Sequence, residues 1–396
     1  MGEFTPDFYS MHPDRRLGPV LASFPADLFS DTLWRSIAWA ELYVDALVVE
    51  VVARLDLVPP IASGLSAEAL CARAGLVSGF TPRAAWLLDR LVARGLLFTE
   101  GGREAPLYGA TQPLPTIDLP GLRASGVAID PGNRATAALL DAACSVWPRV
   151  ARGETNGEDA LLGAGEIALW LDYFANSNAL YAANNRLAAH VAAERLQRSA
   201  DWAILELGAG AGSGTEALLE EFANRGCSPQ IKRYVVSEPS AFFRRRGERR
   251  LAGRVERPTL SFRNLDIDHS WAEQGFVECN FDLVFAVNVL HVADDLAFSL
   301  REVRRHLRPG GWLVAGECLR PFPGYPVYIE FVFRLLDSFL KVKTDTQVRP
   351  EAGFLTPEAW QQAASCAGFT EVEIVPDHVR IRQIEPRFSL GAICAR

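Results

Sequence analysis

The chain has 396 residues, of which 49% are hydrophobic and 22% charged, so it can bury a large core and is not a disordered chain. Lys and Arg number 40 and Asp and Glu number 48, and the resulting net charge of −8 disfavours non-specific binding to nucleic acid or anionic lipid. The longest apolar run is shorter than the roughly 20 residues of a membrane span, and residues 1–19 lack the apolar segment of a signal peptide. The seven cysteines form no Cys-x-x-Cys pair, and no Asp/His cluster has the spacing of metal ligands. We therefore expect a cytoplasmic protein with free thiols and without a metal, nucleic-acid or membrane partner.

The first 125 residues have the pattern of a helical domain. Residues 24–57 carry apolar side chains at a spacing near 3.6, which predicts a long helix buried on more than one side. A capped helix at 66–75, a second helix at 81–94 and two strand-like runs at 96–99 and 107–111 follow. Helix, turn, helix and hairpin is the order of a winged-helix unit. Because Asp89 lies among the arginines of the second helix, we favour a dimerisation or lid role over DNA recognition.

Residues 126–196 predict a helical linker. Helices are expected at 125–153 and 166–196, joined by a Gly-rich loop. In the second of these, aromatic and amide side chains recur every three or four residues, at Trp170, Phe174, Asn178, Tyr181 and Asn185. A buried amide needs hydrogen-bond partners, so this stripe could face a ligand as readily as a core. We expect it to contribute to a substrate pocket.

From residue 202 onwards, short apolar runs alternate with helical patterns. The runs lie at 203–207, 234–237, 260–262, 281–287 and 312–315, and the helical patterns at 214–225, 240–251 and 294–307. This alternation predicts a parallel sheet covered by helices on both faces, with 371–375 and 388–394 as the last strands. Ligands of such sheets bind beyond the carboxyl ends of the strands, so the residues after each strand are the site candidates.

The first of these strands runs into Glu206-Leu-Gly-Ala-Gly-Ala-Gly212. Glycines allow a tight turn and let a ligand approach the main chain. The dinucleotide fingerprint G-x-G-x-x-G fails in the registers that start at Gly208 and Gly210, and no P-loop lysine follows. The motif suits a ligand that carries an ammonium and a carboxylate but no pyrophosphate.

This segment resembles motif I of the class I S-adenosylmethionine (SAM)-dependent methyltransferases, and further marks of that family follow in order. The resemblance implies a set of cofactor-binding residues: Glu206, Gly208, Gly210, Gly212, Glu238, Asp266, Ile267 and Asn288. In that family the acid at the place of Glu238 accepts the ribose hydroxyls, and the pair at the place of Asp266 and Ile267 holds the adenine. SAM is thus the expected cofactor and S-adenosylhomocysteine (SAH) the expected product. A Rossmann-like enzyme with another nucleotide is the alternative.

Two titratable residues are expected at the same rim of the sheet. His291 follows the fourth strand and Glu317 ends the fifth, so adjacent parallel strands should place them side by side. A neutral imidazole can take a proton from a methyl acceptor, and a carboxylate can fix the imidazole tautomer.

From about residue 27 onwards the chain resembles the plant-type and bacterial small-molecule O-methyltransferases, which dimerise through a winged-helix domain. The resemblance implies that His291 is the catalytic base and that Glu317 orients it. The chain departs from that family after the histidine, where Val292-Ala293 replaces Asp-Trp. It also departs at Phe354, the approximate place of a second acid, with Glu351 nearby. These departures suggest an acceptor that differs from a plain phenol.

The SAM half alone also resembles the C-methyltransferase domains of polyketide synthases, in which a His–Glu pair deprotonates an activated carbon. The choice between oxygen and carbon therefore stays open. An aromatic-rich insertion at 321–347, with a helix expected at 328–341, offers Tyr328 and Phe331 as lining of an apolar acceptor pocket or as bundle packing.

We therefore expect an α/β protein: a Rossmann-like class I methyltransferase sheet at 197–396, a mainly helical winged-helix dimerisation domain at 1–125, and the linker at 126–196. The expected activity is SAM-dependent O-methylation of a hydroxyl or enol of a small secondary metabolite by a homodimer, in natural-product or antibiotic biosynthesis. C-methylation of a polyketide-type intermediate, and non-methylating chemistry on the SAM fold, are the alternatives.

Overall fold

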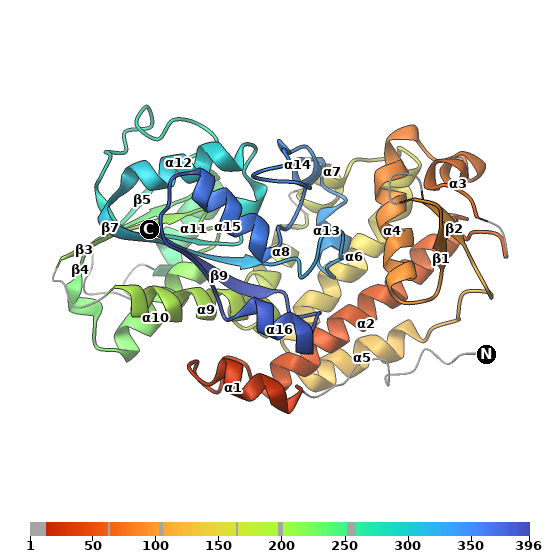
Figure 1. Cartoon of the computed structure of the whole chain (residues 1–396), viewed down its shortest axis with the longest axis horizontal. Helices are drawn as coiled ribbons and strands as arrows, with labels where there is room; N and C mark the ends of the chain where they lie inside the picture. Colours follow the sequence, from red (N-terminus) through yellow and green to blue (C-terminus); the bar gives the residue numbers. More distant parts are fainter. Residues whose placement is uncertain (1–12, 62–63, 103–105, 164, 197–200, 252–258) are drawn as a thin grey trace. The chain divides into compact units, whose positions relative to one another are not determined.

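The computed structural model describes residues 13–61, 64–102, 106–163, 165–196, 201–251 and 259–396 (Figure 1). Contacts divide the chain into two units. The helical unit contains residues 31–173 and 322–340, and the sheet unit contains residues 14–30, 174–321 and 341–396. The prediction about a signal peptide falls mainly on residues 1–12, which lie outside the described residues. No helix in the described part of the chain has the length and apolarity needed to cross a membrane.

The sheet unit is built on a seven-stranded sheet in the order β5-β4-β3-β6-β7-β9-β8. Its strands are β3 (Trp202–Leu207), β4 (Ile231–Ser237), β5 (Thr259–Arg263), β6 (Phe281–Val287), β7 (Leu307–Cys318), β8 (Val372–Val375) and β9 (Leu390–Ala395). The strands from β3 to β7 pair in parallel, as predicted. However, β9 runs antiparallel to both β7 and β8, so the sheet is mixed where a parallel one was predicted. Antiparallel neighbours need no long crossover, which suits the short final stretch of chain.

Helices cover both faces of this sheet (Figure 1). On one face α9 (Ala179–Arg195) packs against β7, β9 and α10 (Ser213–Asn224). On the other, α12 (Leu296–His306) and α15 (Pro357–Cys366) pack against each other and against the sheet. The remaining helices are η2 (Arg15–Leu17), α1 (Gly18–Leu21), η4 (Ser228–Gln230), α11 (Ala241–Leu251), η5 (Leu290–Val292) and α16 (His378–Ile384). Trp271 and Trp360 are fully buried in the core between the sheet and the α12 layer.

The helical unit contains the predicted order of helix, turn, helix and hairpin. Its elements are α2 (Asp31–Arg54), α3 (Ala67–Arg73), η3 (Ser78–Phe80), α4 (Thr81–Ala93), β1 (Phe98–Glu100), β2 (Leu107–Gly109), α5 (Leu119–Ile129), α6 (Asn133–Ala151), α7 (Gly157–Leu161), α8 (Ile167–Tyr173), α13 (Glu330–Phe333) and α14 (Asp337–Leu340). The Ser66 hydroxyl caps α3 by accepting a hydrogen bond from the Ala69 N–H at 3.1 Å. Gly75 and Gly95 follow α3 and α4 with φ of 67° and 71°, as glycines that end helices do. A winged-helix assignment and dimerisation stay predictions.

Four predicted helices have different bounds in the structure. The long first helix begins at Asp31 and not at residue 24, since a turn at 26–29 precedes it. The helix expected at 125–153 is two helices, separated at 130–132 by Asp-Pro-Gly. The insertion forms only the short α13 and α14. The helix expected at 166–196 is interrupted at 174–178, where Ser213 Oγ donates to the Phe174 carbonyl and Asn176 Nδ2 donates to the Ser213 carbonyl at 3.0 Å.

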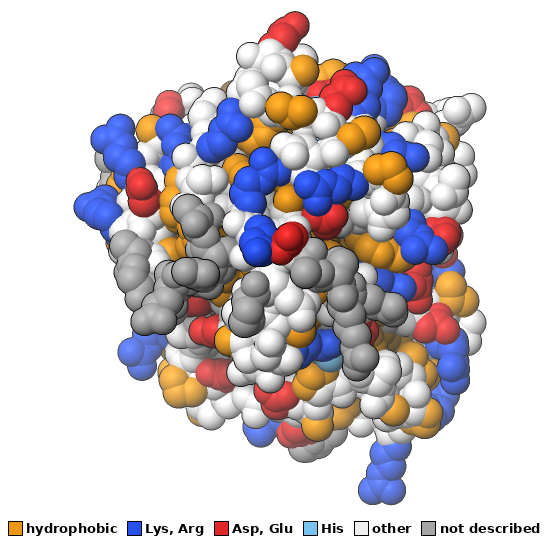
Figure 2. Space-filling view, turned by 90° about the vertical axis from the view of Figure 1, so that its left-hand side faces the viewer, with side chains coloured by type: hydrophobic (Ala, Val, Ile, Leu, Met, Phe, Trp, Pro, Cys, Tyr) orange, Lys and Arg blue, Asp and Glu red, His pale blue; other side chains and the backbone are white. Residues whose placement is uncertain are grey.

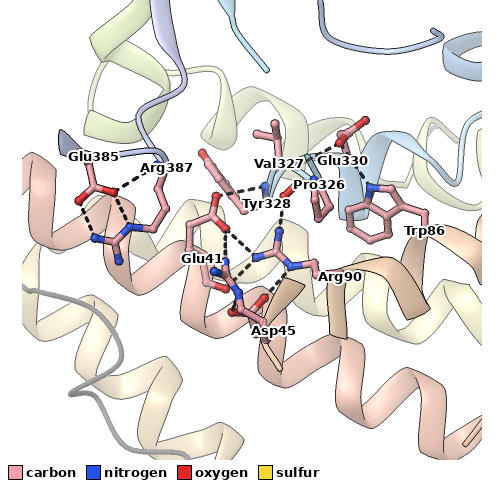
Figure 3. Close-up of polar contacts among 11 residues, drawn as sticks. Glu41, Asp45, Trp86, Arg90, Pro326, Val327, Tyr328, Glu330, Glu385 and Arg387 are labelled. Carbon is pink, nitrogen blue, oxygen red and sulfur yellow. Dashed lines mark hydrogen bonds and ion pairs between the residues drawn. The ribbon is translucent and has the colours of Figure 1, made fainter. Parts of the chain in front are cut away.

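A buried ionic cluster explains why the insertion belongs to the helical unit (Figure 3). Arg90 of α4 is fully buried and binds Glu41 and Asp45 of α2, each at 2.7 Å. Its Nη1 donates to the Pro326 carbonyl at 2.9 Å, and Glu41 also accepts from the Tyr328 N–H at 3.3 Å. Contacts thus place residues 322–340 with α2 and α4. Contacts also place α9 with the sheet. The sheet unit therefore takes up the chain at residue 174, and not at residue 197 as predicted.

Charges of both signs mix on the surface. On the face drawn in Figure 2, Lys and Arg side chains lie among Asp and Glu side chains and apolar ones. In the sheet unit, Lys232 pairs with Asp201 at 2.9 Å and Arg308 with Asp282 at 2.7 Å. Such exposed pairs contribute about 0–1 kcal/mol each to the free energy of unfolding, so they do not determine the fold.

Candidate active site

His291 and Glu317 form a buried hydrogen-bonded pair. The imidazole Nδ1 lies 2.6 Å from the Glu317 Oε2, and the two residues are 3% and 0% exposed. The strands β6 and β7 bring them together, because Val287 at the end of β6 pairs with Gly316, the residue before Glu317. An ionised carboxylate can only accept hydrogen bonds, so a neutral imidazole in this position carries its proton on Nδ1 and its lone pair on Nε2. The prediction that these two side chains lie side by side is therefore confirmed by the geometry, while their catalytic role is a proposal.

The carboxylate of Glu317 is itself held in place by the backbone of the loop that carries the histidine. Its Oε1 accepts hydrogen bonds from the N–H groups of Val289 at 3.2 Å and of Leu290 at 2.9 Å. Together with the imidazole, these donors give the buried charge three hydrogen bonds, which a buried carboxylate requires. The loop therefore fixes the acid, and the acid in turn fixes the imidazole.

Asn288 was predicted to bind the cofactor, and the structure places it beside the His–Glu pair. Its backbone adopts φ of 54°, and its N–H donates to the Gly316 carbonyl at 2.7 Å. Its side-chain oxygen accepts from the Cys318 N–H at 3.0 Å and from Asn184 Nδ2 at 3.2 Å. Asn288 thus binds both neighbours of Glu317 along β7.

The glycine loop after β3 forms an open cradle. Gly208, Gly210 and Gly212 have φ of 54°, 52° and 90°, which L side chains rarely adopt. A Cβ on Gly208 would lie 2.6 Å from Val289 Cγ2, so this residue must stay small for the loop to approach the histidine loop. A Cβ on Gly210 would meet no atom within 4 Å, so the space there is open to a ligand.

Glu206 lies beneath this loop and is 2% exposed. Its Oε2 accepts hydrogen bonds from the Thr215 hydroxyl and from the Tyr234 hydroxyl, both at 2.6 Å. Burial raises the pKa of Glu206 to about 7, against the opposing effect of these two donors. A cationic group placed next to Glu206 would favour its ionised form, as the expected contact with the SAM ammonium requires.

Glu238 and Asp266 follow the strands β4 and β5, at the same edge of the sheet as the glycine loop. The Glu238 carboxylate accepts from the N–H of Gly210 at 2.9 Å and from that of Ser240 at 2.8 Å. Each carboxylate oxygen has a second lone pair, so Glu238 can still accept a ribose diol. Burial raises the pKa of Glu238. Asp266 accepts from the Asp268 N–H at 3.0 Å and lies 2.9 Å from His269 Nδ1, and Ile267 packs against the core behind it.

The predicted pocket residues fall into two groups, one in each unit. In the sheet unit, the rings of Phe174 and Tyr181 lie 5.0 Å apart, and Asn178 precedes α9. Burial and the nearby carboxylates of Glu206 and Glu317 raise the pKa of Tyr181, so the phenol keeps its proton. Since α8 and α9 are separate helices, the single stripe predicted from Trp170 to Asn185 does not form.

The other group packs inside the helical unit. Trp170 donates its indole N–H to the Leu161 carbonyl at 2.6 Å. Phe331 is fully buried, 5.6 Å from the Trp147 ring, and Tyr328 is 7% exposed. These contacts are those of a helix-bundle core, and a role of these three residues toward an acceptor is not visible in them.

Two residues next to the His–Glu pair were not identified as site residues from the sequence. Phe354 is the residue at the approximate place of the second acid of the O-methyltransferases, and its ring centroid lies 4.7 Å from that of the imidazole. Arg349 is 1% exposed and donates to the carbonyl of His291. No sequence motif marks an arginine 58 positions away as a partner of the histidine. In the described residues, no group of three or more His, Cys, Asp or Glu side chains could hold a metal ion.

Comparisons with known proteins show a match to a methyltransferase domain. Residues 205–313 match the family model of a methyltransferase domain. The chain is 30% identical over 240 residues to the highly reducing polyketide synthase valA of Aspergillus terreus, covering 59% of this chain and 9% of that protein. It is 33% identical over 172 residues to the lovastatin diketide synthase lovF of the same species, covering 43% of this chain and 6% of that protein. The chain thus spans less than a tenth of the length of these relatives.

Three solved structures share the fold over most of the chain. The carbon methyltransferase of CurJ aligns with a TM-score of 0.76 and 23% identity, over 96% of this chain and 97% of that one. The CMeT domain of the citrinin polyketide synthase aligns with a TM-score of 0.71 and 17% identity, over 91% and 89%. The trans-methyltransferase CalH, in complex with SAH, aligns with a TM-score of 0.62 and 18% identity, over 97% and 93%.

The sheet, the glycine cradle and the family match define a Rossmann-like, class I SAM-dependent methyltransferase domain preceded by a helical region. The residues present fit the cofactor: an open cradle lies at Gly210, and two buried carboxylates flank it. Residues 205–313 thus match a methyltransferase domain, and SAM is the cofactor that this fold and these residues fit.

Proposed function

We propose that this protein is a SAM-dependent C-methyltransferase that acts on an activated carbon, flanked by carbonyl groups, of a polyketide-type intermediate. The observation that carries the proposal is the buried His291–Glu317 pair at 2.6 Å, beside the glycine cradle. Such a pair can remove a proton from carbon when the resulting charge is spread onto adjacent carbonyl oxygens. Such a product would belong to natural-product biosynthesis.

The residues divide the work as follows. SAM, when bound, supplies an electrophilic methyl group and leaves as SAH. His291 takes the proton of the acceptor carbon on Nε2, and the electron pair of the broken C–H bond forms the new C–C bond to the methyl carbon. Glu317 keeps the Nδ1 proton oriented and stabilises the imidazolium that results. The Gly208–Gly212 loop, Glu206, Glu238, Asp266 and Ile267 are proposed to bind SAM, and close approach of the two carbons should supply much of the rate.

Carbon is favoured over the oxygen expected from the plant-type resemblance for two reasons. The solved structures of CurJ and citrinin synthase that share this fold carry carbon-methyltransferase names, and the sequence relatives are polyketide synthases. In addition, an aromatic ring, Phe354, lies on the imidazole at the approximate place where the O-methyltransferases carry a second acid. In the described residues Glu317 is the carboxylate bound to the imidazole, and one orienting carboxylate suffices for an acceptor whose C–H is already acidic.

The test uses SAM labelled with ¹³C in the methyl group and a 3-oxoacyl thioester of N-acetylcysteamine as the acceptor. The product is analysed by NMR, which separates a methyl group on carbon from one on oxygen. We expect the label on the carbon between the carbonyls, no product with His291→Ala, and normal product with the control His190→Gln, which alters an imidazole of α9 paired with Glu221. A label on oxygen would contradict the proposal and restore the O-methyltransferase alternative.

A further inference from the structure

The loop that carries His291 is held from its backbone side by a buried arginine. Arg349 Nη1 donates to the Ala293 carbonyl at 2.8 Å, and its Nη2 donates to the His291 carbonyl. The same Nη2 lies 3.4 Å from the Gly353 carbonyl. One guanidinium therefore joins the end of the histidine loop to the segment that carries Phe354. A planar fork of donors can serve several carbonyls at once, which a lysine ammonium cannot do in the same geometry.

The Phe354 segment is fixed on its other side by a second buried arginine. Arg320 is 1% exposed, and its Nε donates to the Phe354 carbonyl at 2.9 Å and lies 3.3 Å from Glu351. The Phe354 ring then covers the imidazole, with an angle of 44° between the ring planes. His291 is thus held in three places: Glu317 binds its Nδ1, the ring of Phe354 packs against its imidazole, and Arg349 binds its backbone carbonyl.

Arg349 is a buried cation whose hydrogen-bond partners are neutral backbone carbonyls. Its side chain reaches three carbonyls but forms no ion pair within the described contacts, although the carboxylates of Glu317, Asp268 and Asp294 lie close enough to favour its charged form. Burial outweighs these carboxylates and lowers the pKa of Arg349 to about 10, so it stays cationic at neutral pH. A buried cation is costly unless its hydrogen bonds are made. Packing alone would be served better by an apolar side chain.

We propose that Arg349 is a positioning residue of the methyl-transfer reaction, which sets the imidazole of His291 by clamping the carbonyls of His291 and Ala293 against the Phe354 segment. This inference rests on the proposed role of His291 as the base. Arg349, although far from His291 in the sequence, would then fix the conformation of the histidine loop. Removing its guanidinium should displace the imidazole even though Glu317 remains.

The first test reads the position of the imidazole without any reaction. A buried Nδ1 proton bound to a carboxylate exchanges slowly and gives a ¹H NMR resonance downfield of the amide region. It is assigned by its absence in His291→Ala. We expect Arg349→Met to shift this resonance or broaden it beyond detection. The control Arg308→Met removes an arginine near the start of β7, where it pairs with Asp282 and makes no contact with the histidine loop or the Phe354 segment, and it should leave the resonance in place.

The second test separates turnover from binding. Arg349→Met should lower kcat by about 10- to 100-fold, as expected for a misplaced reacting group, with the Kd of SAM changed less than about threefold. Arg349→Lys should recover part of kcat, since it restores one donor. If Arg349→Met does not fold, Arg349→Lys is compared with the wild type in both measurements. An unchanged resonance and a kcat within about twofold of wild type in the folded variant would overturn the proposal. Because the NMR readout needs no acceptor, it stays informative even if the acceptor is not a 3-oxoacyl thioester.

Discussion

The substitution Glu317→Gln removes one charge from the site and keeps its shape. In the wild type the carboxylate accepts from two backbone N–H groups through Oε1 and from the imidazole through Oε2. The glutamine oxygen can keep the two backbone donors, so its NH₂ group then faces Nδ1. The imidazole must accept that hydrogen bond and carry its proton on Nε2. The base is lost through the wrong tautomer, without any loss of packing.

The magnitude follows from the geometry. The charge centres of an imidazolium and a carboxylate joined by this hydrogen bond lie about 4 Å apart, which is worth about 4 kcal/mol at an effective dielectric constant of about 20. Loss of this stabilisation corresponds to about a 10³-fold decrease in kcat. The Kd of SAM should change by less than about threefold, because Glu317 does not lie on the glycine loop.

The assay measures SAH formation by mass spectrometry with the 3-oxoacyl thioester, and SAM binding by calorimetry. Glu302→Gln is the matched control, since Glu302 is also buried and also accepts a backbone N–H, that of Trp271 at 2.8 Å, in a place remote from the His–Glu pair. Its kcat should stay near the wild-type value. A Glu317→Gln variant that retains more than about a tenth of the wild-type kcat would refute the assignment of Glu317 as the group that orients the base.

Further substitutions at Glu206, Asn288 and Arg90 test the cofactor site, the support of the His–Glu pair and the buried ionic cluster. The pKa of Glu206 is raised from 4.5 to about 7, so the folded protein keeps a proton that the unfolded chain has released, and the unfolding free energy should fall as the pH rises across this interval. Glu206→Gln should remove that dependence in denaturation curves and should weaken SAM binding most above pH 7. Asn288→Gly tolerates the φ of 54° but loses the hydrogen bonds with Cys318 and Asn184. We expect kcat to fall about tenfold and the Kd of SAM to stay near the wild-type value. A parallel loss of SAM affinity would instead support a contact between Asn288 and the cofactor. Arg90→Met leaves Glu41 and Asp45 buried without their inner partner and should lower the unfolding free energy by about 3–5 kcal/mol, more than Arg94→Met, whose side chain is 14% exposed.

The sheet unit could be predicted from the sequence because its signals are local. Apolar runs mark the strands, and the residues after them fall on one edge by the geometry of parallel strands. For this reason His291 and Glu317, 26 positions apart in the chain, were expected to lie side by side, and they do. The antiparallel direction of β9 had no such local mark.

The helix boundaries were less predictable, because side-chain contacts made by loops compete with periodicity. The break between α8 and α9 depends on hydrogen bonds from Asn176 and Ser213, which join segments 37 and 39 positions apart. The insertion has aromatic residues at helical spacing, yet its path is set by carbonyl and N–H contacts with Arg90 and Glu41. Arg349 was not predicted for the same reason: its partners are backbone carbonyls, which carry no sequence signature.

His291 is proposed to remove the proton from the methyl acceptor in a site that binds SAM independently of this residue. The most direct measurement is single-turnover methyl transfer by His291→Ala, followed as SAH released per enzyme, with the Kd of SAM determined on the same sample. We expect turnover to fall by at least about 10³-fold while the Kd of SAM stays within about threefold of the wild-type value. Methyl transfer at near wild-type rate, or loss of SAM binding together with turnover, would contradict the claim.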